Sequence, residues 1–225
     1  NNNVEHISEV EKLGHRWRLT DPGLLVKRYP VCSAAHSTID EISRLTYQAD
    51  ITPNDIDTIR LEVPKLVRIS LIYDTPQTMN ESQFSLPFAS ACAVRHGAVR
   101  LSDLNKEFLH SSEQQTLMKK IEICIADDLS TEDMRKRFPE CAQVEILLKD
   151  GTKLSGFCGE AYGMPNRPLS DADFCSKIED CLVFAGCQEV PDILDKDVLP
   201  LAADLLGRNT TKSTTHSLSK GGAYS

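Results

Sequence analysis

The sequence predicts an α+β fold, in which strands and helices are mixed without regular βα units. Residues 59–63 and 121–125 alternate strictly between apolar and polar side chains, which indicates half-buried strands. Asp150-Gly151 joins two strand-like runs at 144–148 and 152–157, which is a strong signal for an antiparallel hairpin. Because no glycine-rich phosphate loop follows any strand, nucleotide and nicotinamide cofactors are disfavoured.

The first 50 residues contain four predicted elements. Residues 4–13 are mainly polar and indicate a short helix or an unattached arm, and residues 16–19 resemble a strand. An extended segment at 24–30 ends at a proline. Apolar residues then recur at helical spacing over 33–48, with Ser33 available as the N-cap.

The middle of the chain predicts a strand and two helices. After turn chemistry at 52–55, the strand at 59–63 stops at a proline. Small apolar residues over 84–95 predict a tightly packed helix with Gly97 as its C′ residue. A further helix is expected from a cap at Ser102 through His110.

The C-terminal quarter changes character at a loop over 159–168, which is rich in glycine and proline. Ser170 is expected to cap an amphipathic helix that ends at Gly186, and a shorter helix is expected at 198–206. Residues 207–225 contain almost no apolar side chains, and they predict a disordered tail.

Composition excludes several classes of protein. The 225 residues can bury a substantial core, and 33 acidic against 25 basic side chains give a net charge of −8. No basic tract exists, so a nucleic-acid partner is not expected. The uncharged run at 84–94 is too short to cross a bilayer and contains a proline, so no membrane span is expected either.

Eight cysteines are scattered singly, and no pair has the CxxC spacing of a metal site. Three of them repeat every six residues near the C-terminus without a matching histidine. We therefore expect buried thiols in a reducing compartment and no metal centre. The eight are Cys32, Cys92, Cys124, Cys141, Cys158, Cys175, Cys181 and Cys187.

Candidate chemistry concentrates at 27–36, where Lys27, Tyr29, Cys32 and His36 span an extended segment and a helix start. The backbone N–H groups of a helix start favour an anion, and Lys27 could pair with a carboxylate or transfer a proton. The alternative is structural: Lys-Arg pairs are usually solvated, and a single histidine is often only hydrogen-bonded. Arg68 could add positive charge to a pocket.

The segment from Lys27 to His36 resembles the Lys-x-Tyr-Pro-x-Cys-x-x-x-His signature of the MmgE/PrpD family. Three further similarities occur in the same order, and together they cover about 13–206. They are Leu13-Gly14-x-x-Trp17, then Gln83-Phe84-Ser85-Leu86-Pro87-Phe88-Ala89 followed by His96-Gly97, and finally Asp150-Gly151 with Pro165-Asn166-Arg167-Pro168-Leu169-Ser170.

The resemblance implies a lid domain of antiparallel strands covered by helices at 19–159. It also implies an N-terminal arm at 1–18 and, at 160–206, helices that belong to an all-helical domain, before the tail at 207–225. In this family the active site lies between the two domains. Because most of the helical domain is missing from this chain, we expect either pairing with such a domain or a homodimer, in the cytoplasm or mitochondrion.

The activity implied by the resemblance is a cofactor-independent lyase acting on a di- or tricarboxylic acid. Lys27 and His36 are the expected catalytic residues, and Lys27, Tyr29, Cys32 and Arg68 the expected substrate-binding residues. A 2-methylcitrate dehydratase is favoured, because Cys32 and Arg68 stand where the decarboxylase branch has a histidine and a tyrosine. The alternatives are a cis-aconitate decarboxylase, an epimerase, or a truncated non-catalytic paralogue that acts through a full-length partner.

Overall fold

The fold is described from a computed structural model that covers residues 14–15, 17 and 23–186. The chain divides into two units, Asn1–Ser170 and Asp171–Ser225. Of the second unit the structure describes helix α9, Asp171–Phe184, which agrees with the helix expected after Ser170. The expected arm at 4–13, the strand at 16–19, the helix at 198–206 and the tail lie wholly or mainly outside the described residues.

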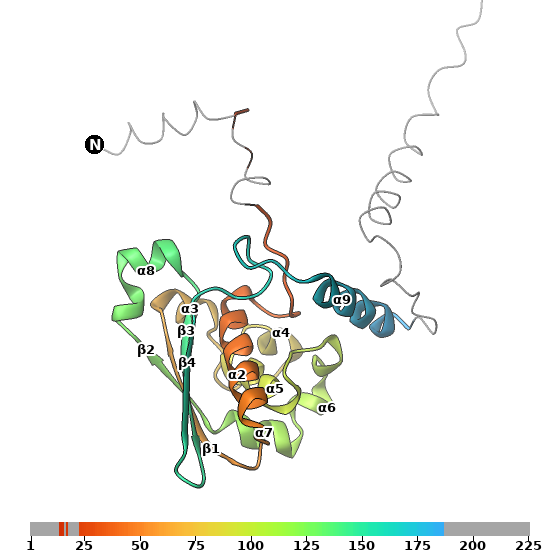
Figure 1. The fold of residues 1–225 in the computed structure, drawn as a ribbon. Coiled ribbons are helices and arrows are strands. Elements are labelled where there is room, and N and C mark those ends of the chain that lie inside the picture. The colour runs from red at the N-terminus through yellow and green to blue at the C-terminus, as the bar shows by residue number, and fades with distance from the viewer. Residues whose placement is uncertain (1–13, 16, 18–22, 187–225) are drawn as a thin grey trace, which may run out of the picture. The chain divides into compact units, whose positions relative to one another are not determined.

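The first unit is built on a four-stranded sheet in the order β2-β1-β3-β4 (Figure 1). Its strands are β1 (Ile56–Val63), β2 (Ile121–Ile125), β3 (Ala142–Leu148) and β4 (Lys153–Cys158). The expected antiparallel pairing holds for β1 with β3 and for β3 with β4, whereas β1 and β2 run parallel. The α+β class is confirmed, and the sheet is mixed.

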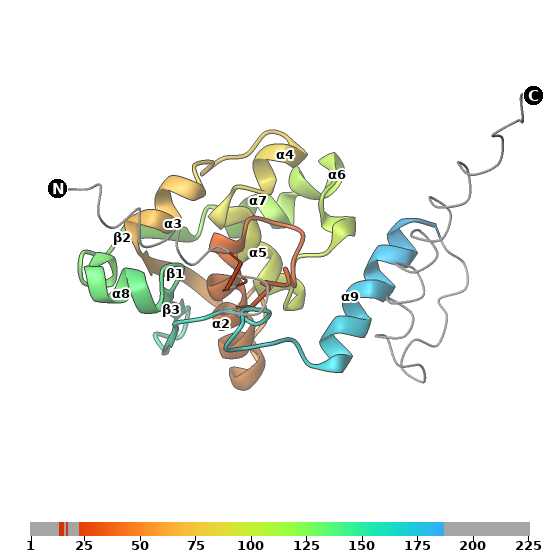
Figure 2. The same ribbon diagram turned by 90° about the horizontal axis from the view of Figure 1, so that it is seen from above.

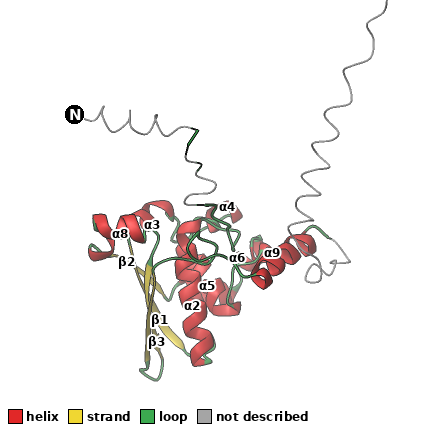
Figure 3. Cartoon of the chain, turned by 45° about the horizontal axis from the view of Figure 1, so that its top comes forward, coloured by secondary structure: helices red, strands yellow, loops and turns green. Residues whose placement is uncertain are grey.

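Helices α2, α5 and α7 gather on one face of the sheet, whereas α8 lies on the other side of the strands, as the two views in Figures 1 and 2 show. Helix α2 packs on β3, β4 and α5, and α5 packs in turn on α7. Figure 3 shows the same separation of the helical layer from the strands. The helical elements of this unit are η1 (Ser33–Ala35), α2 (His36–Ala49), α3 (Lys65–Ser70), α4 (Met79–Ser82), α5 (Leu86–His96), η2 (Leu101–Asp103), α6 (Lys106–Leu109), α7 (Ser112–Met118), η3 (Asp128–Ser130) and α8 (Glu132–Arg137).

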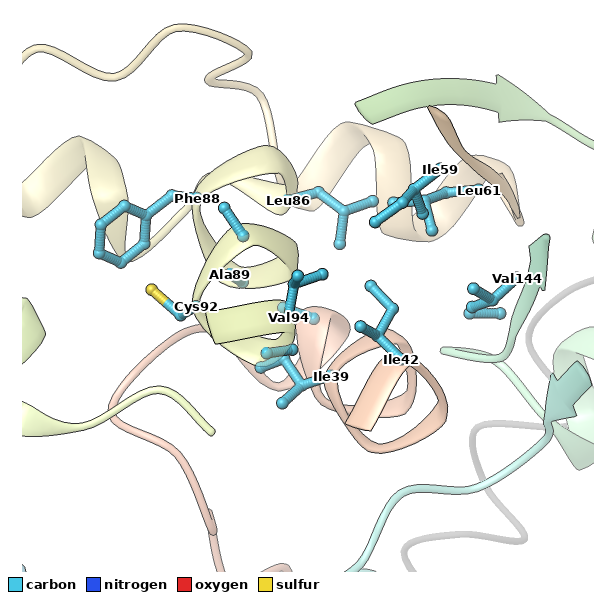
Figure 4. Close-up of a cluster of buried hydrophobic side chains, with 14 of the residues drawn as sticks. Ile39, Ile42, Ile59, Leu61, Leu86, Phe88, Ala89, Cys92, Val94 and Val144 are labelled. Carbon is cyan, nitrogen blue, oxygen red and sulfur yellow. The ribbon is translucent and has the colours of Figure 1, made fainter. Parts of the chain in front are cut away.

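The hydrophobic core lies between this helical layer and the sheet (Figure 4). Ile39 and Ile42 on α2 are fully buried, as are Ile59 and Leu61 on β1. Helix α5 carries small residues from Ala89 onward and buries nearly its whole length, so it can approach α2 closely. The apolar side chains at alternate positions of β1 account for the inward face that the sequence predicts.

The opposite face of the sheet is polar. Arg60 on β1 forms an ion pair with Glu62 at 2.9 Å, and Lys153 on β4 forms one with Glu145 on β3 at 3.6 Å. Such exposed ion pairs contribute little to stability, and their charged groups keep this face of the sheet in contact with solvent. The sheet is therefore half-buried, as the strict alternation in the sequence predicts.

Local signals in the sequence account for the ends of several elements. Ser85 caps α5 by accepting a hydrogen bond from the Phe88 N–H at 3.2 Å, and Gly97 ends the helix with φ 75°. Asp150 accepts the Thr152 N–H at 2.8 Å in the β3–β4 hairpin, where Gly151 has φ 90°. The predictions of Gly97 as the end of the helix and of a hairpin at Asp150-Gly151 are confirmed, whereas the cap at Ser85 was not predicted.

Two predicted caps are wrong. Ser33 makes no cap bond; it opens the 3₁₀ turn η1, and its hydroxyl donates instead to Glu140 at 3.1 Å. The single helix expected from Ser102 to His110 is replaced by two short elements, η2 and α6. Asn105 caps α6 by accepting the Phe108 N–H at 2.8 Å. Asn is as good a cap as Ser, and the choice between them depends on the path of the chain.

The described cysteines are reduced, and Cys92, Cys141, Cys158 and Cys175 are buried. Within 23–186 no three histidine, cysteine, aspartate or glutamate side chains come together as a metal site would require. None of the described helices has the length and apolar character that crossing a bilayer demands.

Candidate active site at the start of helix α2

The segment that carries Lys27 is extended and is held by two other loops rather than by the sheet. The Val26 N–H donates to the carbonyl of Gly163 at 2.9 Å. At the other end of the segment, the Cys32 N–H donates to the Gln83 carbonyl at 2.9 Å, and the Gln83 side-chain amide donates to the Pro30 carbonyl at 3.0 Å. Lys27 therefore lies on a strip of backbone that is fixed on both sides.

The contact between this segment and the loop at 160–168 requires glycine. Gly163 has φ 93°, a conformation that L side chains rarely adopt, and a Cβ at this position would lie only 2.0 Å from the Val26 carbonyl oxygen. The close approach of two backbones therefore sets the position of the Lys27 segment.

Asp40, on α2, links the segment that carries Lys27 to the loop at 160–168. One of its carboxylate oxygens accepts the Tyr29 hydroxyl at 2.7 Å and forms an ion pair with Arg28 at 3.5 Å. The other accepts the Tyr162 N–H at 2.8 Å. Burial raises the pKa of Asp40 above its usual value, although the bonds from Tyr162 and Tyr29 and the charge of Arg28 act in the opposite direction.

Two guanidinium groups and an aromatic ring complete this network. The Arg28 guanidinium lies 5.2 Å from the centre of the Tyr162 ring, and that of Arg167 lies 3.7 Å from it. Arg167 also donates to the carbonyl of Glu160 at 2.7 Å. Cation–π contact and hydrogen bonds thus order the loop at 160–168, which in turn holds Val26.

The structure separates the predicted site residues by depth. Lys27 is exposed and Cys32 is half-buried. Tyr29 and His36 are buried, with 4% and 1% of their surface exposed, and their rings pack edge to face with centroids 5.1 Å apart. Lys27 is therefore the most exposed of the predicted site residues in this motif, whereas Tyr29 and His36 lie in the interior.

Arg68 lies on α3, an element that contacts η1 at the same end of the domain. Its guanidinium donates to the Leu71 carbonyl and pairs with Asp74, both at 2.8 Å. The pair with Asp74 offsets much of the positive charge that Arg68 was expected to offer a substrate carboxylate.

Sequence reasoning missed two carboxyl groups at this end of the domain, Asp40 and Glu140. Glu140 accepts the Ser33 hydroxyl at 3.1 Å; burial raises its pKa, whereas the Ser33 bond and the charge of Lys27 lower it. Asp40 lies one turn after His36, away from the apolar positions of the predicted helix, so the local pattern gives no sign that Tyr29 and Tyr162 bury it. Nothing in its local sequence marks Glu140, because its neighbours come from a distant segment.

Exposed apolar side chains accompany this end of the domain. Leu24 and Leu25 begin the extended segment at 24–30 that carries Lys27, and Phe84 follows Gln83, whose carbonyl accepts the Cys32 N–H. The Tyr73 N–H donates to the Phe84 carbonyl at 3.3 Å, and Ile72 beside it is 58% exposed. We call Leu24, Leu25, Ile72, Tyr73 and Phe84 the apolar rim.

The fold and site thus define an α+β domain with an exposed lysine on an anchored segment at one end. Comparison with known sequences assigns this domain: residues 29–194 match the MmgE/PrpD C-terminal domain. The chain therefore belongs to the MmgE/PrpD family, as the motifs around Lys27 predict.

One curated relative is the cis-aconitate decarboxylase of Mus musculus, which is 22% identical over 170 residues. This match covers 72% of the chain and 33% of the relative, so the chain spans about a third of the length of the protein it matches.

Proposed function

We propose that the chain is the lid portion of an MmgE/PrpD-type lyase that removes water from a di- or tricarboxylic acid, as a 2-methylcitrate dehydratase does. The observation that carries this proposal is the exposed Lys27, on a segment fixed by Gly163 on one side and Gln83 on the other. A lysine held in this way can pair with a carboxylate at a small entropic cost.

In this proposal the Lys27 ammonium binds the carboxylate next to the carbon that loses its proton. Negative charge develops on that group as the proton leaves, so the ammonium stabilises the transition state more than the ground state. Tyr29 and His36 act as positioning residues, because their buried rings fix the turn between Lys27 and α2.

We propose that the apolar rim docks on an all-helical domain, which completes the site. The rim borders the Lys27 segment, and about two thirds of the relative's length lies outside the match, which is enough chain for such a domain in that relative. Burying these side chains would supply hydrophobic stabilisation of about 25 cal/mol per Å². A homodimer through the same rim is the competing arrangement, and light scattering at increasing concentration distinguishes the two.

The activity is tested by mixing the purified chain with 2-methylcitrate or cis-aconitate and following alkene absorbance and released CO₂. We expect water loss from 2-methylcitrate, either by the chain alone or after a full-length family member supplies the helical domain. If neither compound changes under either condition, the enzyme proposal fails and the non-catalytic paralogue is favoured.

Lys27→Ala provides the residue-level test. We expect turnover to fall by at least about 100-fold with a melting temperature within about 2 °C of the wild type, because an exposed lysine contributes little to folding. Lys119→Ala, which removes another exposed lysine after α7, is the matched control. Equal loss of activity and stability in Lys27→Ala would make the residue structural.

A decarboxylase is the second candidate, favoured by the match to the mouse cis-aconitate decarboxylase. Release of CO₂ from cis-aconitate without alkene formation from 2-methylcitrate would select it. An epimerase would do neither, and would instead exchange the α-hydrogen with deuterium from the solvent.

A further inference from the structure

Glu140 lies in the connection between α8 and β3, immediately before the buried Cys141. Its carboxylate accepts the hydroxyl of Ser33, the first residue of η1, at 3.1 Å. A residue more than a hundred positions away in the sequence is thus brought to the turn that follows the Lys27 segment.

Electrostatics also connects Glu140 with Lys27. Burial is the main influence on the Glu140 carboxyl and raises its pKa, while the bond from Ser33 and the charge of Lys27 lower it. The Lys27 ammonium therefore lies close enough to Glu140 for its charge to act on that carboxyl group.

Resting on the function proposed above, we propose that Glu140 is a proton donor of this site, giving its proton to the hydroxyl group that leaves the substrate while Lys27 holds the neighbouring carboxylate.

The step balances as follows. A general base of the completed enzyme takes the α-proton, and the electron pair of that C–H bond forms the carbon–carbon double bond. The C–O bond breaks with its electron pair on oxygen, which takes the proton of Glu140 and departs as water. Glu140 is left as a carboxylate and regains a proton from solvent.

The surroundings of Glu140 suit this role better than those of a surface glutamate. An exposed glutamate is ionised at neutral pH and has no proton to give, whereas the burial that raises the pKa of Glu140 shifts its equilibrium toward the acid form. After transfer, the Ser33 hydroxyl and the Lys27 ammonium stabilise the carboxylate that remains.

The coupling is tested without any activity, by following the carboxyl carbon of Glu140 by NMR in the 225-residue chain, with Glu140→Gln to assign the signal. We expect Glu140 to titrate above the ordinary value of 4.5, and higher again in Lys27→Met, because the ammonium that favours the carboxylate is gone. A Glu140 titration midpoint at or below 4.5, or one that Lys27→Met leaves unchanged, would overturn the electrostatic coupling of Glu140 to Lys27.

The catalytic role is tested with Glu140→Gln on 2-methylcitrate, under conditions in which the wild type is active. We expect kcat to fall 10²- to 10⁴-fold with KM little changed. In an analogue with chlorine in place of the hydroxyl, chloride departs without needing a proton. This analogue should therefore react nearly as fast with the variant as with the wild type. Glu132→Gln, at an exposed glutamate paired with Lys136, should change neither rate.

Two results would overturn the proton-donor role: wild-type rates in Glu140→Gln, or an equal loss on both compounds, which marks a structural residue. If the wild type turns over neither compound, the proposed function fails, and the titration still decides separately whether Glu140 is coupled to Lys27.

Discussion

The anchoring of the Lys27 segment on Gly163 gives the sharpest test of the structure. In Gly163→Ala the new Cβ would lie 2.0 Å from the Val26 carbonyl oxygen, against at least 3.4 Å for an ordinary contact. The two backbones must therefore separate by more than 1 Å, which breaks the 2.9 Å hydrogen bond between them. The segment that carries Lys27 moves as a consequence.

The expected loss of stability has two parts. A left-handed backbone costs an alanine about 1 kcal/mol relative to glycine. The lost hydrogen bond and the forced separation add about 1–2 kcal/mol, so the total is about 2–3 kcal/mol. Urea denaturation followed by circular dichroism measures this difference.

Gly151→Ala is the matched control. Gly151 has φ 90°, close to that of Gly163, but nothing lies within 4 Å of its added Cβ. This variant should lose only about 1 kcal/mol. Because both substitutions restrict the unfolded chain equally, the difference between them isolates the backbone contact. Equal losses in the two variants would refute the close packing of the Lys27 segment on the loop at 160–168.

Two further predictions concern titrating groups. Burial raises the pKa of Asp40, so the folded state binds a proton more readily than the unfolded state. Relative to Asp40→Asn, the wild type should therefore gain stability as the pH falls through that pKa, and urea titrations that give a pH-independent difference would contradict this. Burial also raises the pKa of the Cys141 thiol to about 11, from an ordinary value of 9.0. At pH 8 Cys141 should react with a disulfide reagent at least about 100-fold more slowly than the exposed Cys181. The variant Cys181→Ser identifies the fast phase of labelling. A fast phase that Cys141→Ser abolishes would disprove the burial of Cys141.

Local patterns in the sequence were sufficient for much of the fold. The alternation in 59–63 specifies a strand with one buried face, and that in 121–125 specifies a strand whose Ile121 and Ile123 are partly buried against the core. Asp150-Gly151 specifies the β3–β4 hairpin because glycine adopts the left-handed backbone without strain. Ser85 and Gly97 mark the ends of α5 through bonds that reach only three or four residues.

Predictions failed where a distant segment competes for the same group. Ser33 satisfies the local rule for a cap, but its hydroxyl binds Glu140, which is 107 residues away. The parallel pairing of β1 with β2 likewise has no local signal, because the connection between them runs through several short helices. Neither strand contains information about which neighbour it will meet.

The sequence by itself determined the family, the α+β class and the segment in which to look for chemistry, since these depend on residues close together in the chain. Only the tertiary structure decided that Lys27 faces outward while Tyr29 and His36 are buried, and that Asp40 and Glu140 belong to the same end of the domain. Burial and long-range hydrogen bonding depend on which segments meet in space, and a motif of ten residues cannot specify its distant neighbours.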